Sequence, residues 1–114
     1  MPYIDVKTTA PVTEEKCRAI KSALGDAISL IPGKSEGWLM VGIDPEKKIW
    51  FRGDDSKDSA MVTVSVYGSV SDRDSSRLTG RITEILNEEL GIDPDRVYVA
   101  YGEYDKWGWN GSNF

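Results

Sequence analysis

The sequence contains no histidine and a single cysteine, Cys17, among its 114 residues. One cysteine cannot form an internal disulfide, and the absence of histidine also excludes the usual zinc sites. Asp54, Asp55 and Asp58 lack the spaced ligands and the terminal glutamate of a calcium loop, so we interpret them as a solvated acidic turn. We therefore expect no metal site and no metal catalysis.

The sequence also lacks a long apolar run and a dense cluster of lysine and arginine. No stretch is long enough for a bilayer-spanning helix, and the first residues do not resemble a secretory signal. A net charge of −5 disfavours binding to nucleic acid or to an anionic membrane, because both need a basic surface. The apolar share of 39% and the charged share of 29% are typical of a soluble globular protein. We expect one domain over residues 1–114, located in the cytoplasm.

The first half of the chain predicts a strand, a helix and a second strand. Residues 2–9 alternate between apolar and polar side chains, which indicates a strand. From Thr13 the apolar residues recur at helical spacing, and Pro32 with Gly33 ends this helix. The apolar positions of the helix are Cys17, Ile20, Leu24, Ala27, Ile28 and Ile31. The apolar run 38–43 then predicts a buried strand.

The second half repeats this order with a strand at 60–67, a helix at 71–90 and a strand at 96–101. The offset between equivalent elements is about sixty residues, which divides the chain into halves of about 2–52 and 60–110. Right-handed crossovers within each half place the strands in one sheet and both helices on one face. The predicted class is α+β: a two-layer sandwich of a four-stranded mixed sheet and two helices.

The other face of this sheet is left without a covering layer. The strands carry many apolar residues, namely Ile4, Val6, Val41, Val62, Val64, Val66, Val97 and Val99. A bare apolar face of that size is not stable in water, so we expect a closed homo-oligomer that buries it between subunits. The short segments 49–51 and 107–109 are predicted edge strands that reach a neighbouring subunit.

Pro2 directly follows the initiator methionine at the start of the first strand. While Met1 is attached, the Pro2 nitrogen belongs to an amide and has no basicity. Removal of Met1, which is efficient before a small residue, gives a free secondary amine that exchanges protons near neutral pH more readily than most side chains. Pro2 is therefore a candidate catalytic base in a chain that has no histidine.

Five features together resemble the tautomerase superfamily, and specifically relatives of macrophage migration inhibitory factor. They are Met1-Pro2, Gly33-Lys34, Tyr67-Gly68, the run 95–98 (Asp-Arg-Val-Tyr) and the run 108–110 (Gly-Trp-Asn). Each feature is weak alone, but their order and spacing span nearly the whole chain. The resemblance implies a homotrimer with three active sites at subunit boundaries.

The resemblance also implies roles for individual residues. Pro2 would be the catalytic base, Lys34 its cationic neighbour, and the backbone N–H of Tyr67 a donor to the substrate carboxylate. Tyr98 would enclose the site from the adjacent subunit. The family places apolar residues that line or border the site at the positions of Tyr3, Trp38, Trp107, Trp109 and Phe114.

The chain departs from the family pattern at several of these positions. Relatives usually have isoleucine at Tyr67 and asparagine at Ala100, so the space at the site and one polar contact are altered. Mammalian relatives carry a Cys-x-x-Cys pair where this chain has Ser59 and Val62. A thiol redox activity is therefore excluded.

These residue types suit proton transfer between carbon and oxygen of a 2-keto acid. The reaction needs a base with a pKa near ambient pH and a charge that stabilises the enolate. An apolar site and a nearby cation both lower the pKa of an amine, and aromatic walls suit a substrate such as phenylpyruvate. The leading hypothesis is a cofactor-free isomerase, a phenylpyruvate tautomerase.

Other interpretations of the same residues stay open. Lys34 next to Gly33 suits a helix C-terminus, and the tyrosines and tryptophans suit packing or subunit contacts as well as they suit a ligand site. Cys17 suits a small buried core residue, and the sequence 110–112 suits a turn rather than a glycosylation site.

Two further functional hypotheses use the same scaffold. One is a cytokine-like homologue that binds a host receptor, keeps a weak or vestigial active site, and leaves the cell by a non-classical route. The other is a dehalogenase or decarboxylase, for which Arg52 and Glu36 are the only local candidates.

Overall fold

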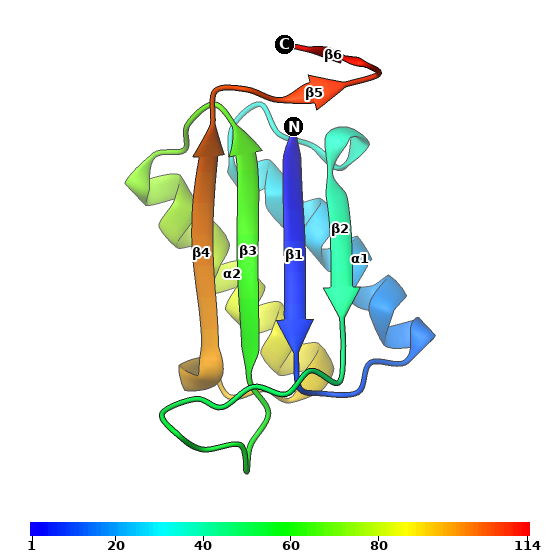
Figure 1. Cartoon of the computed structure of the whole chain (residues 1–114), viewed down its shortest axis with the longest axis vertical. Helices are drawn as coiled ribbons and strands as arrows, with labels where there is room; N and C mark the ends of the chain where they lie inside the picture. The colour runs from blue at the N-terminus through cyan, green and yellow to red at the C-terminus, as the bar shows by residue number, and fades with distance from the viewer.

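The computed structural model describes residues 1–114 and has two layers, a four-stranded sheet and two helices that cover one of its faces (Figure 1). The elements in chain order are β1 (Pro2–Thr8), α1 (Glu14–Ala27), η1 (Ile28–Leu30), η2 (Glu36–Trp38), β2 (Met40–Asp44), β3 (Ala60–Tyr67), α2 (Asp72–Leu90), η3 (Pro94–Arg96), β4 (Val97–Tyr104), β5 (Gly108–Trp109) and β6 (Ser112–Asn113). The sheet order is β2-β1-β3-β4, with β1 parallel to β2, antiparallel to β3, and β3 parallel to β4. The predicted mixed sheet with both helices on one face is confirmed. Neither helix is long and apolar enough to cross a membrane.

Both helices begin where a hydroxyl side chain caps the first turn. Thr13 Oγ1 accepts a hydrogen bond from Lys16 N at 3.2 Å, and Ser71 Oγ accepts one from Asp74 N at 3.1 Å. These caps satisfy amide groups that the helix itself leaves unpaired. Helix α2 ends at Gly91, whose φ of 68° is left-handed and suits glycine. The helix starts predicted from sequence are therefore confirmed.

The core lies between the helices and one face of the sheet. It contains seventeen buried apolar residues, which include Ile20, Leu24, Leu78, Ile82 and Leu86 from the helices. The strands contribute alternate residues, and the register pairs Ile4 with Val64 and Val6 with Val62. Because side chains alternate along a strand, this register directs all these apolar residues to the helix layer.

The expectation of an apolar far face is wrong. Ile4, Val6, Val41, Val62, Val64, Val66, Val97 and Val99 all lie in the register of the helix-covered face. The far face carries polar side chains such as Asp5, Lys7 and Thr63, and Lys7 Nζ lies 3.1 Å from Asp5 Oδ2. Side chains alternate along each strand, so the apolar residues at every second position all lie on the one side that the helices cover. The far face also carries the exposed side chains of Met40, Tyr98 and Tyr104, so it is mixed rather than uniformly apolar.

Three predicted strand segments also differ in the structure. Strand β2 starts at Met40, after the short helix η2, and Met40 is 68% exposed, so β2 is an edge strand of the isolated chain. Residues 49–51 form no strand, and Phe51 makes only an isolated bridge to Asp54. The segment 107–109 contributes β5, which pairs with β6 of the same chain.

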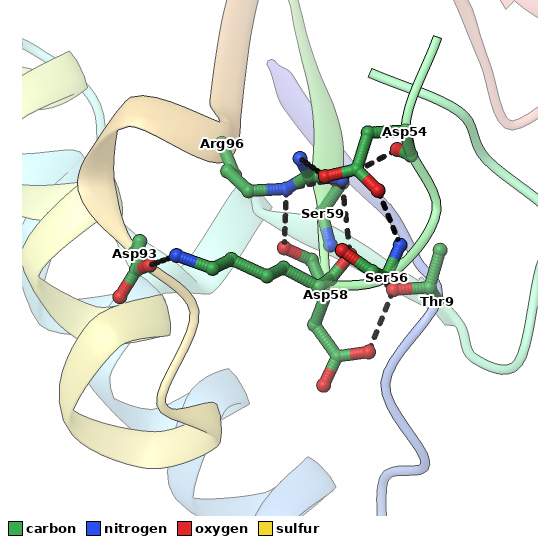
Figure 2. A network of polar contacts seen from close by, with 8 residues as sticks. Thr9, Asp54, Ser56, Asp58, Ser59, Asp93 and Arg96 are labelled. Atoms are coloured by element: carbon green, nitrogen blue, oxygen red, sulfur yellow. Dashed lines mark hydrogen bonds and ion pairs between the residues drawn. The ribbon is translucent and has the colours of Figure 1, made fainter. Parts of the chain in front are cut away.

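Arg96 organises the loop at the end of the sheet away from the N-terminus (Figure 2). Its Nε atom donates to Ser59 Oγ at 2.9 Å and to Asp58 O at 3.1 Å, and Nη2 donates to Asp54 O at 2.9 Å and to Lys57 O at 3.0 Å. Arg96 is only 7% exposed, and these acceptors replace the water that its charge loses on burial. The acidic turn of this loop is therefore fixed by a buried guanidinium.

Substitution of the α2 cap tests the local argument. We expect Ser71→Ala to lower the free energy of unfolding by about 1 kcal/mol, because Asp74 N loses its acceptor. Urea denaturation at one fixed protein concentration measures the change. Ser69→Ala, an exposed serine in the preceding loop, is the control and should change stability by less than about 0.5 kcal/mol. Equal stability of Ser71→Ala and wild type would contradict the cap.

Candidate functional site

The first residues of β1, the last residue of β3 and the loop after α1 meet at one end of the sheet. Figure 1 shows the N-terminus at this end, beneath the C-terminal hairpin formed by β5 and β6. Pro2 pairs with Val66 in the antiparallel register and is buried. Chain segments that are far apart in sequence therefore surround the start of the chain.

Met1, Tyr67 and Lys34 are linked through the peptide groups of Tyr67. Tyr67 N donates to Met1 O at 3.1 Å, and Lys34 Nζ donates to Tyr67 O at 3.3 Å. Partial burial lowers the pKa of the Met1 amine, and the charge of Lys34 lowers this pKa further. The structure thus places a low-pKa terminal amine, an ammonium group and a backbone N–H in one small region.

Met1 occupies two of the groups that the proposed chemistry would use. Its peptide bond makes the Pro2 nitrogen an amide, and its carbonyl takes the Tyr67 N–H. Removal of Met1 releases both at once, because the same residue carries the acyl group and the acceptor. A free Tyr67 N–H beside a free Pro2 amine could then receive an anionic ligand.

A continuous set of aromatic rings borders this region. The Trp38 and Trp109 rings are 5.1 Å apart and nearly perpendicular, at 84°. Trp109 stacks at 6.5 Å with Phe114, and Phe114 lies 5.6 Å from the Tyr67 ring. Four of the site residues expected from sequence therefore come together within one chain.

The rings of Trp107 and Tyr3 do not pair with these four rings, although the carbonyl of Trp107 accepts a hydrogen bond from Phe114 N at 3.0 Å. The Trp107 ring packs at 5.9 Å against Tyr104, a residue that the sequence analysis did not single out. Tyr3 lies on the far face of the sheet, where its hydroxyl is close to Gly42 and to the Asp5 carboxylate. Burial and Asp5 raise the pKa of Tyr3, so it is a neutral phenol at physiological pH.

Tyr98 lies at the opposite end of the sheet from Pro2. In the register, Pro2 pairs with Val66 and Tyr98 pairs with Met61. Val66 and Met61 are five residues apart on β3. At about 3.3 Å per residue, this separation is about 17 Å along the strand. Tyr98 is 61% exposed and packs at 5.2 Å against Phe51. One chain alone therefore does not bring Tyr98 to the N-terminus.

The remaining candidates are also placed by the structure. Glu36 forms an ion pair with Lys21 at 3.2 Å, in η2 near Trp38. Arg52 follows Phe51 in a tight turn with a φ of 54°, at the end of the sheet where Tyr98 lies. Arg52 and Glu36 thus lie near opposite ends of the sheet, and only Glu36 is near the N-terminal region.

The isolated chain has no enclosed ligand cavity at the N-terminal region among its main surface cavities. Five cavities with volumes of about 270 to 400 Å³ are present, and none of the five is lined by Pro2, Lys34 or Tyr67. One of 400 Å³ is lined by Phe51 and Arg96 at the opposite end. No group of three or more carboxylate or thiol side chains gathers where it could hold a metal ion. The N-terminal region of the isolated chain is therefore open rather than enclosed.

Sequence and structure comparisons agree on the family of this chain. The whole chain, residues 1–114, matches the family described as macrophage migration inhibitory factor (MIF). Macrophage migration inhibitory factor of Mus musculus is 28% identical over 118 residues, which cover 100% of this chain and 99% of that protein. The crystal structure of Leishmania major MIF2 has a TM-score of 0.93 and 28% identity, and the match covers 100% of this chain and 97% of that one.

A more distant solved structure shares the fold alone. The crystal structure of Pt0534 inactivated by 2-oxo-3-pentynoate has a TM-score of 0.83 at 18% identity, and the match covers 96% of this chain and 93% of that one. The match along the entire sequence and the shared architecture, with Pro2, Lys34 and the Tyr67 peptide at one end of the sheet, lead to one conclusion: the chain belongs to the macrophage migration inhibitory factor family.

Proposed function

We propose that this protein is a cofactor-free keto–enol tautomerase that uses the Pro2 amine, after removal of Met1, as its general base. One observation carries the proposal: the start of β1, the Lys34 ammonium and the Tyr67 peptide group converge beneath the aromatic hairpin. The base, the cation and the neutral donor that enolisation requires are then within one region.

The environment favours a neutral amine. Partial burial and the charge of Lys34 lower the pKa of the Met1 amine, and we expect both to act in the same direction on a Pro2 amine, one residue further along β1. A free secondary amine is ordinarily protonated at neutral pH, so it cannot accept a proton from carbon. A lowered pKa leaves a useful fraction of the Pro2 amine unprotonated.

A 2-keto acid fits the available donors. Its carboxylate would accept a hydrogen bond from the Tyr67 N–H that Met1 releases, and Lys34 would face the keto oxygen. The Pro2 nitrogen takes a proton from C3, the C–H electron pair forms the C2–C3 double bond, and the carbonyl electron pair moves to oxygen. The protonated amine then supplies a proton to that oxygen, which gives the enol and regenerates the base.

The aromatic wall supports a substrate with an apolar or aromatic side chain. The rings of Trp38, Trp109, Phe114 and Tyr67 offer faces and edges against which a phenyl group can pack. Pt0534, which shares this fold, is inactivated by the 2-keto acid 2-oxo-3-pentynoate. We therefore assign phenylpyruvate-like 2-keto acids as the substrate class.

The proposed active form is a homotrimer in which Tyr98 reaches the Pro2 region of a neighbour. The exposed Tyr98 lies about 17 Å along the strand from the position opposite Pro2, so Tyr98 cannot reach the Pro2 region of its own chain. The half-site at the N-terminus is open, and a heterologous contact repeated around a ring would close three such sites. The far face of the sheet, where polar and apolar side chains are mixed, would line the inside of that ring.

The second candidate function is a cytokine-like ligand that binds a host receptor. The match to the mouse factor over nearly its whole length favours it, as does the Tyr67 ring, which packs on Phe114 and takes space at the site. This role would involve release by a non-classical route, whereas the enzyme would act in the cytoplasm. Receptor binding that is unchanged by Pro2→Gly, in a protein that does not act on phenylpyruvate, would favour this second function.

Loss of the terminal proline amine is the first test of the enzyme. We expect protein that retains Met1, verified by mass spectrometry, and processed Pro2→Gly protein to lose ketonisation of phenylpyruvate enol by about a hundredfold or more. Size-exclusion chromatography should show an unchanged oligomer. Pro11→Gly, an exposed proline in the loop after β1, is the matched control and should stay active. Full activity of the unprocessed protein would refute the mechanism.

The charge of Lys34 gives a second test, through pH. Lys34 disfavours the protonated amine, so Lys34→Met should raise the pKa of the Pro2 amine and move the rise of kcat/KM to higher pH. Titration of ¹⁵N-labelled proline by NMR measures the pKa directly, apart from substrate binding. Lys48→Met, an exposed lysine in the loop after β2, is the control and should leave the titration unchanged. A Pro2 pKa that is unchanged or lower in Lys34→Met would contradict the assigned role.

A further inference from the structure

The aromatic pair at the far end of the sheet is held by a network that the proposed mechanism does not use. Tyr98 is the second residue of β4 and is largely exposed, yet its ring lies 5.2 Å from Phe51 at an interplanar angle of 75°. Phe51 in turn lies beneath the guanidinium of Arg96, whose Cζ is 5.4 Å from the ring centroid. An exposed tyrosine thus has one side packed against a ring that is itself fixed.

Most of the hydrogen-bond donors of Arg96 are paired with acceptors from the loop. Three of its contacts are backbone carbonyls, those of Asp54, Asp58 and Lys57, and its carboxylate contact, Nη1 to Asp54 Oδ2, is longer at 3.4 Å (Figure 2). A buried guanidinium bound mainly to carbonyls holds backbone in place more than it neutralises charge. The loop that carries Phe51 is therefore anchored to the start of β4.

Phe51 is also fixed by its own turn. Its N and O atoms exchange hydrogen bonds with O and N of Asp54, both at 3.0 Å, around Arg52 and Gly53 with positive φ. The turn places the ring between Arg96 and Tyr98. Contacts thus run from the loop carbonyls through Arg96 and Phe51 to Tyr98.

We propose that Arg96 and Phe51 are positioning residues that hold the Tyr98 ring ready for the active site of the neighbouring subunit. This inference rests on the proposed trimeric tautomerase. A ring ordered before assembly loses less conformational freedom when it contacts substrate, so the effect falls on substrate binding. Neither Arg96 nor Phe51 touches the reacting atoms in this arrangement.

Phe51→Leu is the principal test, because it removes the ring contact and leaves the hydrogen bonds of Arg96 in place. We expect KM for phenylpyruvate to rise roughly two- to tenfold and kcat to change by less than about twofold, as for loss of one pre-ordered side chain. Arg96→Lys should shift KM in the same direction, because an ammonium cannot reproduce the fork of donors. Phe51→Met is a second variant if Phe51→Leu does not assemble.

Tyr101→Phe is the matched structural control. Tyr101 lies on the same strand but on the helix-covered face, where its hydroxyl donates to Ser75 O at 2.7 Å. The variant should lower thermal stability and leave KM unchanged. A Tyr98→Leu background supplies the double-mutant cycle, in which Phe51→Leu should have no further effect on KM. An equal effect of Phe51→Leu with and without Tyr98 would overturn the inference.

Mixed trimers test whether the Phe51 that affects an active site comes from the same subunit as Pro2 or from its neighbour. When Pro2→Gly chains and Phe51→Leu chains are unfolded, mixed equally and refolded, about half of the sites with an intact Pro2 should face an intact Phe51 and regain the wild-type KM. A positioning role within one chain predicts that every active site keeps the raised KM. That outcome would refute action across the subunit boundary.

Ring order measured without substrate distinguishes this inference from the proposed function. NMR relaxation of ¹³C-labelled tyrosine should show a more mobile Tyr98 ring in Phe51→Leu and an unchanged ring in Tyr101→Phe. If wild-type protein ketonises no 2-keto acid, the proposed function fails, and this measurement still decides whether Arg96 and Phe51 hold Tyr98. An equally ordered ring in Phe51→Leu would refute the positioning role.

Discussion

The antiparallel pairing of β1 with β3 is the constraint on which the rest of this structure depends. It fixes the first residues of the chain opposite the last residues of β3, so Pro2 faces Val66 and the Met1 carbonyl accepts from Tyr67 N. The final rung of the ladder is thus made by a residue that aminopeptidase processing can remove. Removal leaves a backbone donor without a partner at the end of β3, which is unfavourable until water or a ligand occupies it.

The two ends of the sheet supply different parts of one proposed site. The N-terminal end gathers the amine, Lys34 and four aromatic rings from within a single chain, while the other end presents Tyr98 on β4, packed against Phe51 of an anchored loop. Surfaces that are unlike each other and lie at opposite ends favour a head-to-tail contact, which closes into a ring when the rotation permits. The far face of the sheet mixes polar residues with the exposed side chains of Met40, Tyr98 and Tyr104, and it is compatible with the interior of such a ring.

Sequence patterns predicted the elements whose period and caps are local. Helix α2 follows from its apolar spacing and Ser71, and β1 and β3 follow from strict alternation. The side of the sheet on which the apolar residues lie depends on strand register, which no local pattern gives. The apolar run in β2 predicts a buried strand whether or not a neighbouring strand covers it, but β2 lies at the edge of the sheet. The link from Arg96 to Phe51 joins residues 45 positions apart, and no local pattern marks it. In the sequence, the only indication of this link is that Arg96 stands two residues before Tyr98 in the run 95–98.

The departures of this chain from the family pattern fall on side chains, whereas the proposed chemistry depends mostly on the backbone and the chain terminus. The donor at Tyr67 is a peptide N–H, which is the same for tyrosine and isoleucine, so the larger ring changes only the aromatic wall with Phe114. Ala100 lies on the far face, away from the helix layer, and its exposed methyl group leaves the β3–β4 pairing intact. Such replacements leave the terminal amine, the peptide N–H and the lysine in place, because the sheet positions the amine and the N–H directly. Substrate preference can therefore diverge within this family while the groups that move the proton stay in place.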